Sequence, residues 1–139
     1  MNTFKLKIIT PDGSFYDSDA YQLSLKSIDG EISILAGHIP YLTAVGMGEC
    51  RVYTSPGGAP MRAACCGGML KVSKEGVLLA PTTFEWADDI DSARAQSAKE
   101  RAEAALFGNP SEADKRIATQ KLARAAVRLK VAAASGKNN

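Results

Sequence analysis

The stretch Asp88-Asp89-Ile90-Asp91-Ser92-Ala93-Arg94-Ala95 decides the fold of this chain, because the hydrophobic pattern changes there. Before it, apolar and polar residues alternate with a period of two, which is typical of strands. After it, apolar residues recur every three or four positions, which is typical of helices. An aspartate at a helix start accepts hydrogen bonds from free backbone N–H groups, so we expect Asp88 or Asp89 to cap a helix. The stretch therefore predicts a boundary between a β domain, residues 1–86, and a helical domain, residues 87–139.

The segment before this boundary has the pattern of a small all-β domain. About nine short alternating stretches are separated by turn residues such as Pro11-Asp12-Gly13, Asp29-Gly30 and Gly67-Gly68. The polar run Asp17-Ser18-Asp19 predicts a break within the second stretch. Many short strands at close spacing predict a β-sandwich or a β-barrel.

The segment after the boundary predicts two amphipathic helices whose contact surfaces consist mostly of alanine. Gly108-Asn109-Pro110 separates them, and Ser111 with Asp114 forms a weaker variant of a capping box. Alanine lets two helices approach closely but buries little apolar area. We therefore expect an antiparallel two-helix hairpin that is marginally stable and movable. The seam positions are Ala95, Ala98, Ala102 and Ala105 in the first helix, and Ala118, Leu122, Ala125, Leu129 and Ala132 in the second.

Composition and motifs exclude several classes of protein. A hydrophobic content of 45% and a charged content of 23% are those of a globular chain, and no apolar run approaches the roughly 20 residues of a membrane-spanning helix. His38 is the only histidine, and neither a Walker A loop nor a Gly-x-Ser-x-Gly motif occurs, so we expect no catalytic site and no metal site. Cys50, Cys65 and Cys66 lack a zinc-binding spacing, so we expect free buried thiols in a reducing compartment.

Positive charge is concentrated in the second domain. Residues 1–87 carry seven Lys and Arg against eight Asp and Glu, whereas residues 88–139 carry ten against seven. No acidic residue follows Asp114. The second domain should therefore prefer an anionic ligand or an acidic partner.

Arginines of both predicted helices lie on stripes beside the alanine seam. Arg94 and Arg101 share one stripe with Asp91, and Arg124 and Arg128 share another. Closing the hairpin should bring several guanidinium groups together, and guanidinium binds phosphate oxygens in a bidentate way. The alternative is a solvated helix face in which Arg94 pairs with Asp91.

Two N-terminal blocks and two later segments resemble the epsilon subunit family of F-type ATP synthases. The N-terminal blocks are Phe4-Lys5-Leu6-Lys7-Ile8-Ile9-Thr10-Pro11-Asp12-Gly13 and Gly30-Glu31-Ile32-Ser33-Ile34-Leu35-Ala36-Gly37-His38-Ile39-Pro40. Asp89-Ile90-Asp91-Ser92-Ala93-Arg94-Ala95 and Leu122-Ala123-Arg124-Ala125-Ala126-Val127-Arg128-Leu129 resemble that family's C-terminal hairpin. Ala36 departs from the proline that is usual in the family. The resemblance covers essentially the whole chain in order.

The resemblance implies a β-sandwich of nine to ten strands followed by a regulatory helical hairpin. It implies a non-catalytic subunit of the central stalk, which couples rotation of the gamma subunit and the c ring to proton-driven ATP synthesis. Glu31 and His38 are expected to face the c ring. The hairpin is expected either to fold down or to extend along gamma to the alpha and beta subunits and inhibit ATP hydrolysis. The protein would be peripheral, held by the complex at the cytoplasmic face of the plasma membrane.

Some members of this family bind ATP in the folded hairpin, so the resemblance implies ATP as a regulatory ligand and no required cofactor. The corresponding positions in this sequence are Glu85, Asp91, Arg94, Ala95, Arg101, Arg124 and Arg128. One alternative is a free-standing soluble ATP-sensing protein without a rotary partner. A nucleic-acid-binding β protein is a weaker alternative, because the strands lack the interleaved aromatic and basic residues that stack bases. We therefore expect no nucleic-acid partner.

Overall fold

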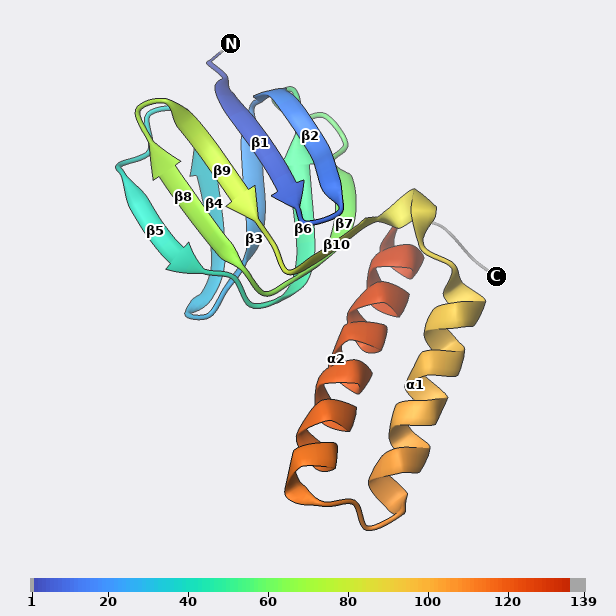
Figure 1. Cartoon of the computed structure of the whole chain (residues 1–139). Helices are drawn as coiled ribbons and strands as arrows, with labels where there is room; N and C mark the ends of the chain where they lie inside the picture. The colour runs from blue at the N-terminus through green and yellow to red at the C-terminus, as the bar shows by residue number, and fades with distance from the viewer. Residues whose placement is uncertain (1, 136–139) are drawn as a thin grey trace. The chain divides into compact units, whose positions relative to one another are not determined.

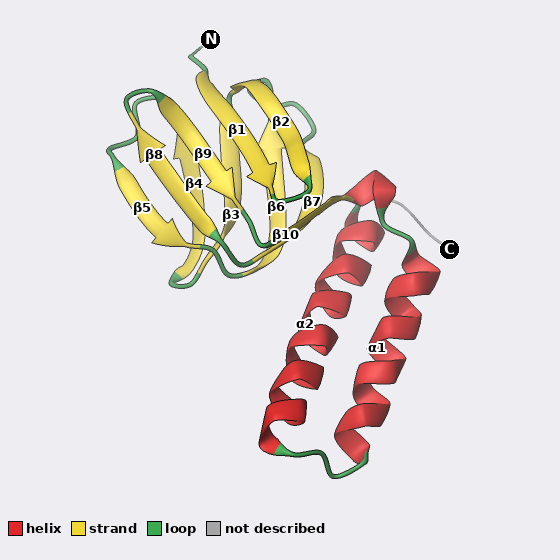
Figure 2. Ribbon diagram, viewed as in Figure 1, coloured by secondary structure: helices red, strands yellow, loops and turns green. Residues whose placement is uncertain are grey.

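The computed structural model describes residues 2–135, and the chain divides between Glu85 and Trp86 into two compact units. Within the described residues, the first unit contains ten strands, and the second contains a short 3₁₀ helix followed by two α-helices (Figure 1). Every strand precedes every helix along the chain. Figure 2 shows the strands in yellow and the helices in red. The structure therefore confirms the change from strands to helices that the sequence predicts.

The strands of the first unit form two five-stranded sheets. One sheet has the order β2-β1-β9-β8-β5, and the other has the order β10-β7-β6-β3-β4. Strands β1 and β9 pair in parallel, whereas β1 and β2 pair antiparallel. Two separate sheets make a β-sandwich rather than a barrel. The bounds are β1 (Phe4–Thr10), β2 (Gly13–Ala20), β3 (Gln22–Ser27), β4 (Gly30–Leu35), β5 (Tyr41–Ala44), β6 (Met47–Tyr53), β7 (Met61–Cys66), β8 (Met69–Ser73), β9 (Gly76–Ala80) and β10 (Thr83–Trp86).

Alternation along the strands produces the core between the two sheets. In β1, Leu6 and Ile8 are buried, whereas Lys5 and Lys7 are exposed. Each such burial is worth about 1.5–3 kcal/mol relative to exposure, so the sandwich has a core of its own. Its largest fully buried side chains include Leu6, Ile8, Leu23, Leu25, Ile34, Val52, Leu70 and Leu79.

An aromatic contact joins the two sheets at one edge of the sandwich. Phe15 of β2 and Phe84 of β10 pack edge to face, with ring centroids 5.2 Å apart. Strand β2 ends one sheet and β10 ends the other, so the pair covers the open side of the core. The three cysteines are buried free thiols, as the sequence predicts.

The predicted break at Asp17-Ser18-Asp19 is wrong, because these residues lie inside β2. In the register of β1 and β2, Lys7 is opposite Asp17 and Lys5 is opposite Asp19. Opposite charges on facing positions stabilise an antiparallel pair. The aspartates therefore belong to the exposed face of an edge strand.

The first helical element of the second unit is η1 (Ala87–Asp89), which delays the start of the first α-helix. The Ile90 N–H donates to the Ala87 carbonyl at 3.2 Å, and the Ile90 side chain is fully buried. Helix α1 (Ser92–Phe107) therefore starts after Ile90, and Asp91 is its N-cap. The prediction that Asp88 or Asp89 caps this helix is wrong, because the 3₁₀ turn places both before the cap position.

Helix α2 (Glu112–Ala134) follows a short connection and lies beside α1 in an antiparallel hairpin (Figure 1). The Asp114 N–H donates to Ser111 Oγ at 3.2 Å, which confirms the predicted cap. The left-handed backbone position in the connection is taken by Asn109, with φ of 54°, a conformation that asparagine tolerates better than most residues.

The seam of the hairpin consists mostly of alanines, as predicted, with Leu122 and Leu129 half-buried. Ala95, Ala102, Ala118 and Ala125 are buried. Ala105 is exposed, so the buried part of the seam does not extend to this predicted position. The apolar area buried between the helices is consequently small.

Candidate functional site

A pocket of about 560 Å³ lies between α1 and α2. Small-molecule sites in proteins usually measure about 300–1,000 Å³, so this pocket is large enough for a small organic ligand. The residues that line it are Ala98, Arg101, Ala102 and Ala105 of α1, and Asp114, Ile117, Ala118, Lys121, Arg124 and Arg128 of α2.

The short alanine side chains create the space in the pocket. Two helices that approach over alanines leave a groove beside the seam, which longer side chains would fill. The apolar part of the lining is aliphatic throughout, with Ile117 as its one larger member. This part of the pocket offers van der Waals contact and no hydrogen-bonding side chain.

Four cationic side chains line the pocket, with one carboxylate. Arg101 comes from α1, and Lys121, Arg124 and Arg128 come from α2. Among residues 2–135, neither Arg101, Lys121 nor Arg124 forms an ion pair with a carboxylate. Like charges in one groove repel each other, and an anion removes that repulsion. The electrostatics of the pocket therefore favour a negatively charged ligand.

The spacing along α2 places its cations on one face. Lys121, Arg124 and Arg128 are separated by three and four residues, which are neighbouring positions on a helix surface. Seven residues of helix rise by about 10.5 Å, so the three groups follow the length of the groove. The arrangement suits an extended anion with charges distributed along it.

The structure brings together three of the residues carried over from the family resemblance. Arg101, Arg124 and Arg128 line one pocket, although they come from two helices. This is the convergence that the helical stripes predict.

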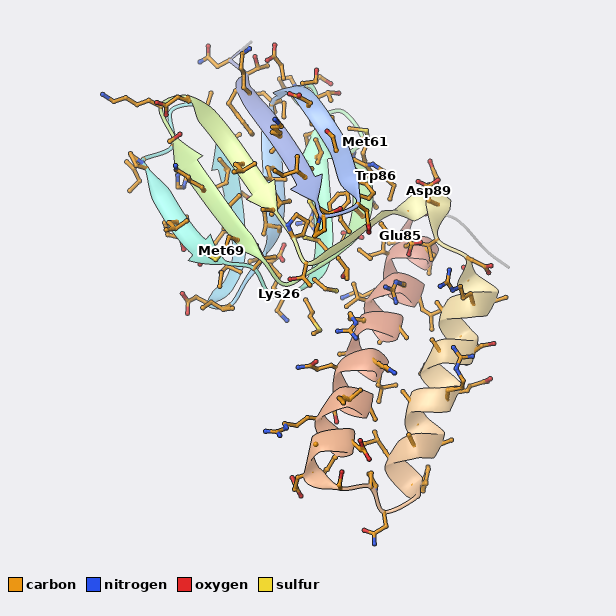
Figure 3. All side chains as sticks on the ribbon, in the orientation of Figure 1. Lys26, Met61, Met69, Glu85, Trp86 and Asp89 are labelled. Atoms are coloured by element: carbon orange, nitrogen blue, oxygen red, sulfur yellow. The ribbon has the colours of Figure 1, made fainter. Side chains whose placement is uncertain are left out.

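The other four predicted residues do not line this pocket. Asp91 caps α1, with its Oδ1 accepting from the Arg94 N–H at 3.0 Å, and the Arg94 side chain is exposed. Ala95 is buried in the seam. Glu85 lies in β10, in the first unit (Figure 3).

The two residues expected to contact a partner are on separate elements of the first unit. Glu31 in β4 accepts from Arg51 Nη2 at 2.9 Å, and Arg51 also donates to Glu49 at 3.0 Å. Partial burial alone would lower the pKa of Arg51, but hydrogen bonds to Glu49 and Glu31 raise it, so this side chain stays charged. His38 is exposed in the loop after β4, and its Nδ1 lies 2.7 Å from the Ile39 carbonyl oxygen.

Three lining residues of the pocket belong neither to the predicted site nor to the predicted alanine seam. They are Asp114, Ile117 and Lys121. Counting back from Arg124 by three, seven and ten positions reaches Lys121, Ile117 and Asp114 in turn, which is the helical spacing of one face. That periodicity is the signal that identifies them.

Within residues 2–135, no group of three or more His, Cys, Asp or Glu side chains is placed to hold a metal ion. No helix in the same range has the length and apolar character needed to cross a membrane.

Two known sequence families match this chain, one in each of its two parts. The family described as the ATP synthase Delta/Epsilon chain, beta-sandwich domain, matches residues 3–87. The family described as the ATP synthase Delta/Epsilon chain, long alpha-helix domain, matches residues 88–133.

Individual relatives match over nearly the whole chain. The ATP synthase epsilon chain of Ruminococcus albus is 37% identical over 133 residues, which cover 95% of this chain and 98% of the relative. That of Bacillus pumilus is 39% identical over 132 residues, with the same shares covered.

Solved structures show the same fold at low sequence identity. A chain of the Euglena gracilis mitochondrial ATP synthase aligns with a TM-score of 0.70 and 18% identity, covering 98% of this chain and 82% of the other. The sandwich, the hairpin and the two family matches agree with the sequence resemblance. The chain belongs to the ATP synthase delta/epsilon chain family, as an epsilon chain.

Proposed function

We propose that this chain works in the central stalk of a bacterial F-type ATP synthase, where it couples rotation of gamma and the c ring to ATP synthesis. Support comes from the bacterial epsilon chains that it matches over nearly their whole length. Further support comes from its likeness, at 14% identity, to a chain in the structure of the Tetrahymena thermophila mitochondrial ATP synthase central stalk and c ring. As an epsilon chain it is a non-catalytic subunit of the enzyme.

The sandwich carries the binding of gamma and the c ring in this proposal. Glu31 and the loop that contains His38 face the c ring. This contact holds the subunit at the cytoplasmic face of the plasma membrane. Cross-linking from a Glu31→Cys variant should then capture the c subunit. Capture of alpha or beta alone would show that the sandwich is oriented differently.

The hairpin carries regulation, and the pocket between its helices is the observation that supports this part. The alanine seam stabilises the closed hairpin only weakly, and the four lining cations oppose closure. ATP bound in the pocket removes the repulsion and forms charge-assisted hydrogen bonds with both helices. Low ATP then releases the helices, which extend towards the alpha and beta subunits and inhibit hydrolysis.

The expected energies are sufficient for such a switch. A ligand that binds only the closed form stabilises it by about 2.7 kcal/mol at 100 times its dissociation constant. That shift exceeds the few tenths to one kcal/mol of a single surface interaction, and it moves a nearly balanced equilibrium almost completely. The ATP concentration therefore sets the fraction of closed hairpins.

Copurification from solubilised membranes tests the assignment to the complex. The tagged chain should bring down the alpha, beta, gamma and c subunits. A free-standing ATP sensor would come down alone and would still bind ATP, so that result would replace the rotary role by the alternative function.

Calorimetry on the full chain tests the ligand. ATP should bind to the wild type, and Arg124→Ala should weaken binding because it removes a lining cation. Arg116→Ala is the matched control, since Arg116 is on the same helix and outside the pocket. Arg94→Ala should also weaken binding if the ligand extends from the pocket to the first turn of α1. Absence of binding at millimolar ATP, or equal binding by the wild type and Arg124→Ala, would contradict the proposal.

A further inference from the structure

Lys121 continues the cationic run of the pocket towards the connection between the helices. It precedes Arg124 by three residues and Arg128 by seven, on the same face of α2, and it lines the same pocket as Arg101. Its side chain forms no ion pair within residues 2–135. The Lys121 ammonium group is therefore available to an anionic ligand.

The antiparallel hairpin fixes the order in which a ligand meets these cations. The C-terminal half of α2 lies alongside the N-terminal half of α1 (Figure 1). Asp91 caps that end of α1, and Arg94 and Ala95 lie in its first turn. A ligand that extends from that end along the groove reaches Arg128 first, Arg124 next and Lys121 last. Arg128 and Lys121 are about 10.5 Å apart along the helix axis, so one phosphate group does not contact both.

We propose that Lys121 binds the terminal phosphate of the triphosphate in this pocket and thereby selects triphosphates over diphosphates. The inference rests on the proposed function for the class of ligand, and it adds the residue that discriminates by the length of the phosphate chain. A terminal phosphate carries about −1.5 to −2 charges at pH 7, which makes it the group that gains most from a cation. The lysine ammonium offers three donors on a long flexible stem, and this suits the end of a chain.

Asp114 lies in the same pocket on the other side of Lys121. It precedes Lys121 by seven residues, again on the same face of α2, and its carboxylate is the single acid among the lining residues. Negative charge beyond the position of Lys121 meets repulsion there. The pocket therefore offers a run of cations that ends at an anion, and a fourth phosphate should gain nothing.

Calorimetry on the full chain with ATP, ADP and inorganic triphosphate tests the role of Lys121. Lys121→Ala should weaken the binding of ATP and of inorganic triphosphate about tenfold, the usual effect of losing one hydrogen bond to a charged group. ADP binding should remain unchanged. Lys115→Ala is the matched control, because it removes a lysine of the same helix that lies outside the pocket. Circular dichroism verifies that each variant keeps its helices.

The outcomes separate this inference from the proposed function. Equal weakening of ATP and ADP by Lys121→Ala, or no weakening of either, would overturn the role of Lys121 while ATP binding by the wild type stands. Binding of inorganic triphosphate but not ATP, lost in Lys121→Ala, would support the role of Lys121 and reject ATP sensing. If the wild type binds neither, both proposals fail.

A second variant tests the end of the cationic run. Asp114→Asn should improve the binding of inorganic tetraphosphate relative to triphosphate, because it removes the repelling charge and keeps the shape of the side chain. An unchanged ratio would show that Asp114 does not limit the length of the bound anion.

Discussion

Replacing Asp91 by alanine should loosen α1 and leave the β-sandwich unaffected. The Asp91 carboxylate accepts a hydrogen bond from the Arg94 N–H at 3.0 Å, which satisfies one of the free donors at the start of the helix. Helix α1 buries only Ala95 and Ala102 fully, so little apolar packing compensates for the loss of a cap. The effect of the substitution should therefore appear almost entirely as opening of the hairpin.

The magnitude follows from two terms. Loss of an N-cap hydrogen bond costs about 1 kcal/mol, and loss of a negative charge at a helix N-terminus costs about 0.3–1 kcal/mol more. The free energy of opening α1 should thus fall by about 1.5 kcal/mol. The open fraction, and with it the rate of hydrogen exchange that follows the opening equilibrium, should rise roughly tenfold. Asp91→Asn should lose only the smaller, charge-dependent part, because asparagine caps helices about as well as aspartate.

Native-state hydrogen exchange without nucleotide measures this change, with the amides of β1 and β8 as an internal reference. Asp89→Ala is the matched control, since Asp89 lies in η1 and does not cap α1. Unchanged exchange in α1 for Asp91→Ala would refute the marginal stability of the hairpin. Equal acceleration in the helices and in the sandwich would refute the independence of the two units.

Three further expectations follow from the structure. A chain of residues 1–86 should unfold cooperatively in urea and still bind gamma, because the sandwich has its own core; loss of gamma binding would contradict this. Burial raises the pKa of the Cys65 thiol to about 12 and that of Cys50 well above its usual value, whereas the unfolded thiols ionise near pH 9.0. The contribution of these thiols to the free energy of unfolding should therefore be constant below about pH 9.0 and fall as pH rises from there, by up to about 1.4 kcal/mol per pH unit for each thiol. Urea titrations should show a smaller fall with pH in Cys65→Ala. Replacing exposed basic residues of α2, such as Arg116 and Lys130, by alanine should raise ATP hydrolysis by the complex and reduce its salt dependence; unchanged hydrolysis with intact assembly would exclude an inhibitory role for this charge.

Much of the fold could be predicted from the sequence, because the periodicity of apolar residues reports burial directly. Leu6 and Ile8 face the core where the alternation places them, and the change of period near Ile90 marks the start of the helical unit. The alternation does not report strand pairing. The aspartates of β2 suggested a break because they form a polar run, whereas in the sheet they face lysines of β1 that the pattern of β2 alone does not reveal.

The pocket was predictable in part. The stripes on each helix indicated that Arg101, Arg124 and Arg128 converge, because side chains three and four positions apart share a helix face. The sequence did not show which neighbours border the same space, since that depends on how closely the helices approach. Lys121 and Asp114 line the groove that the short alanine side chains leave beside the seam, and the sequence pattern alone does not indicate that groove.

ATP hydrolysis by the assembled complex is the most direct test of the regulatory account. It should be measured at micromolar and at millimolar ATP, with the full chain and with a chain that ends at residue 86. The account predicts that truncation raises hydrolysis strongly at micromolar ATP, where the hairpin is extended, and only slightly at millimolar ATP, where bound nucleotide keeps it closed. The same increase at both concentrations, or no increase at either, would contradict a nucleotide-controlled hairpin.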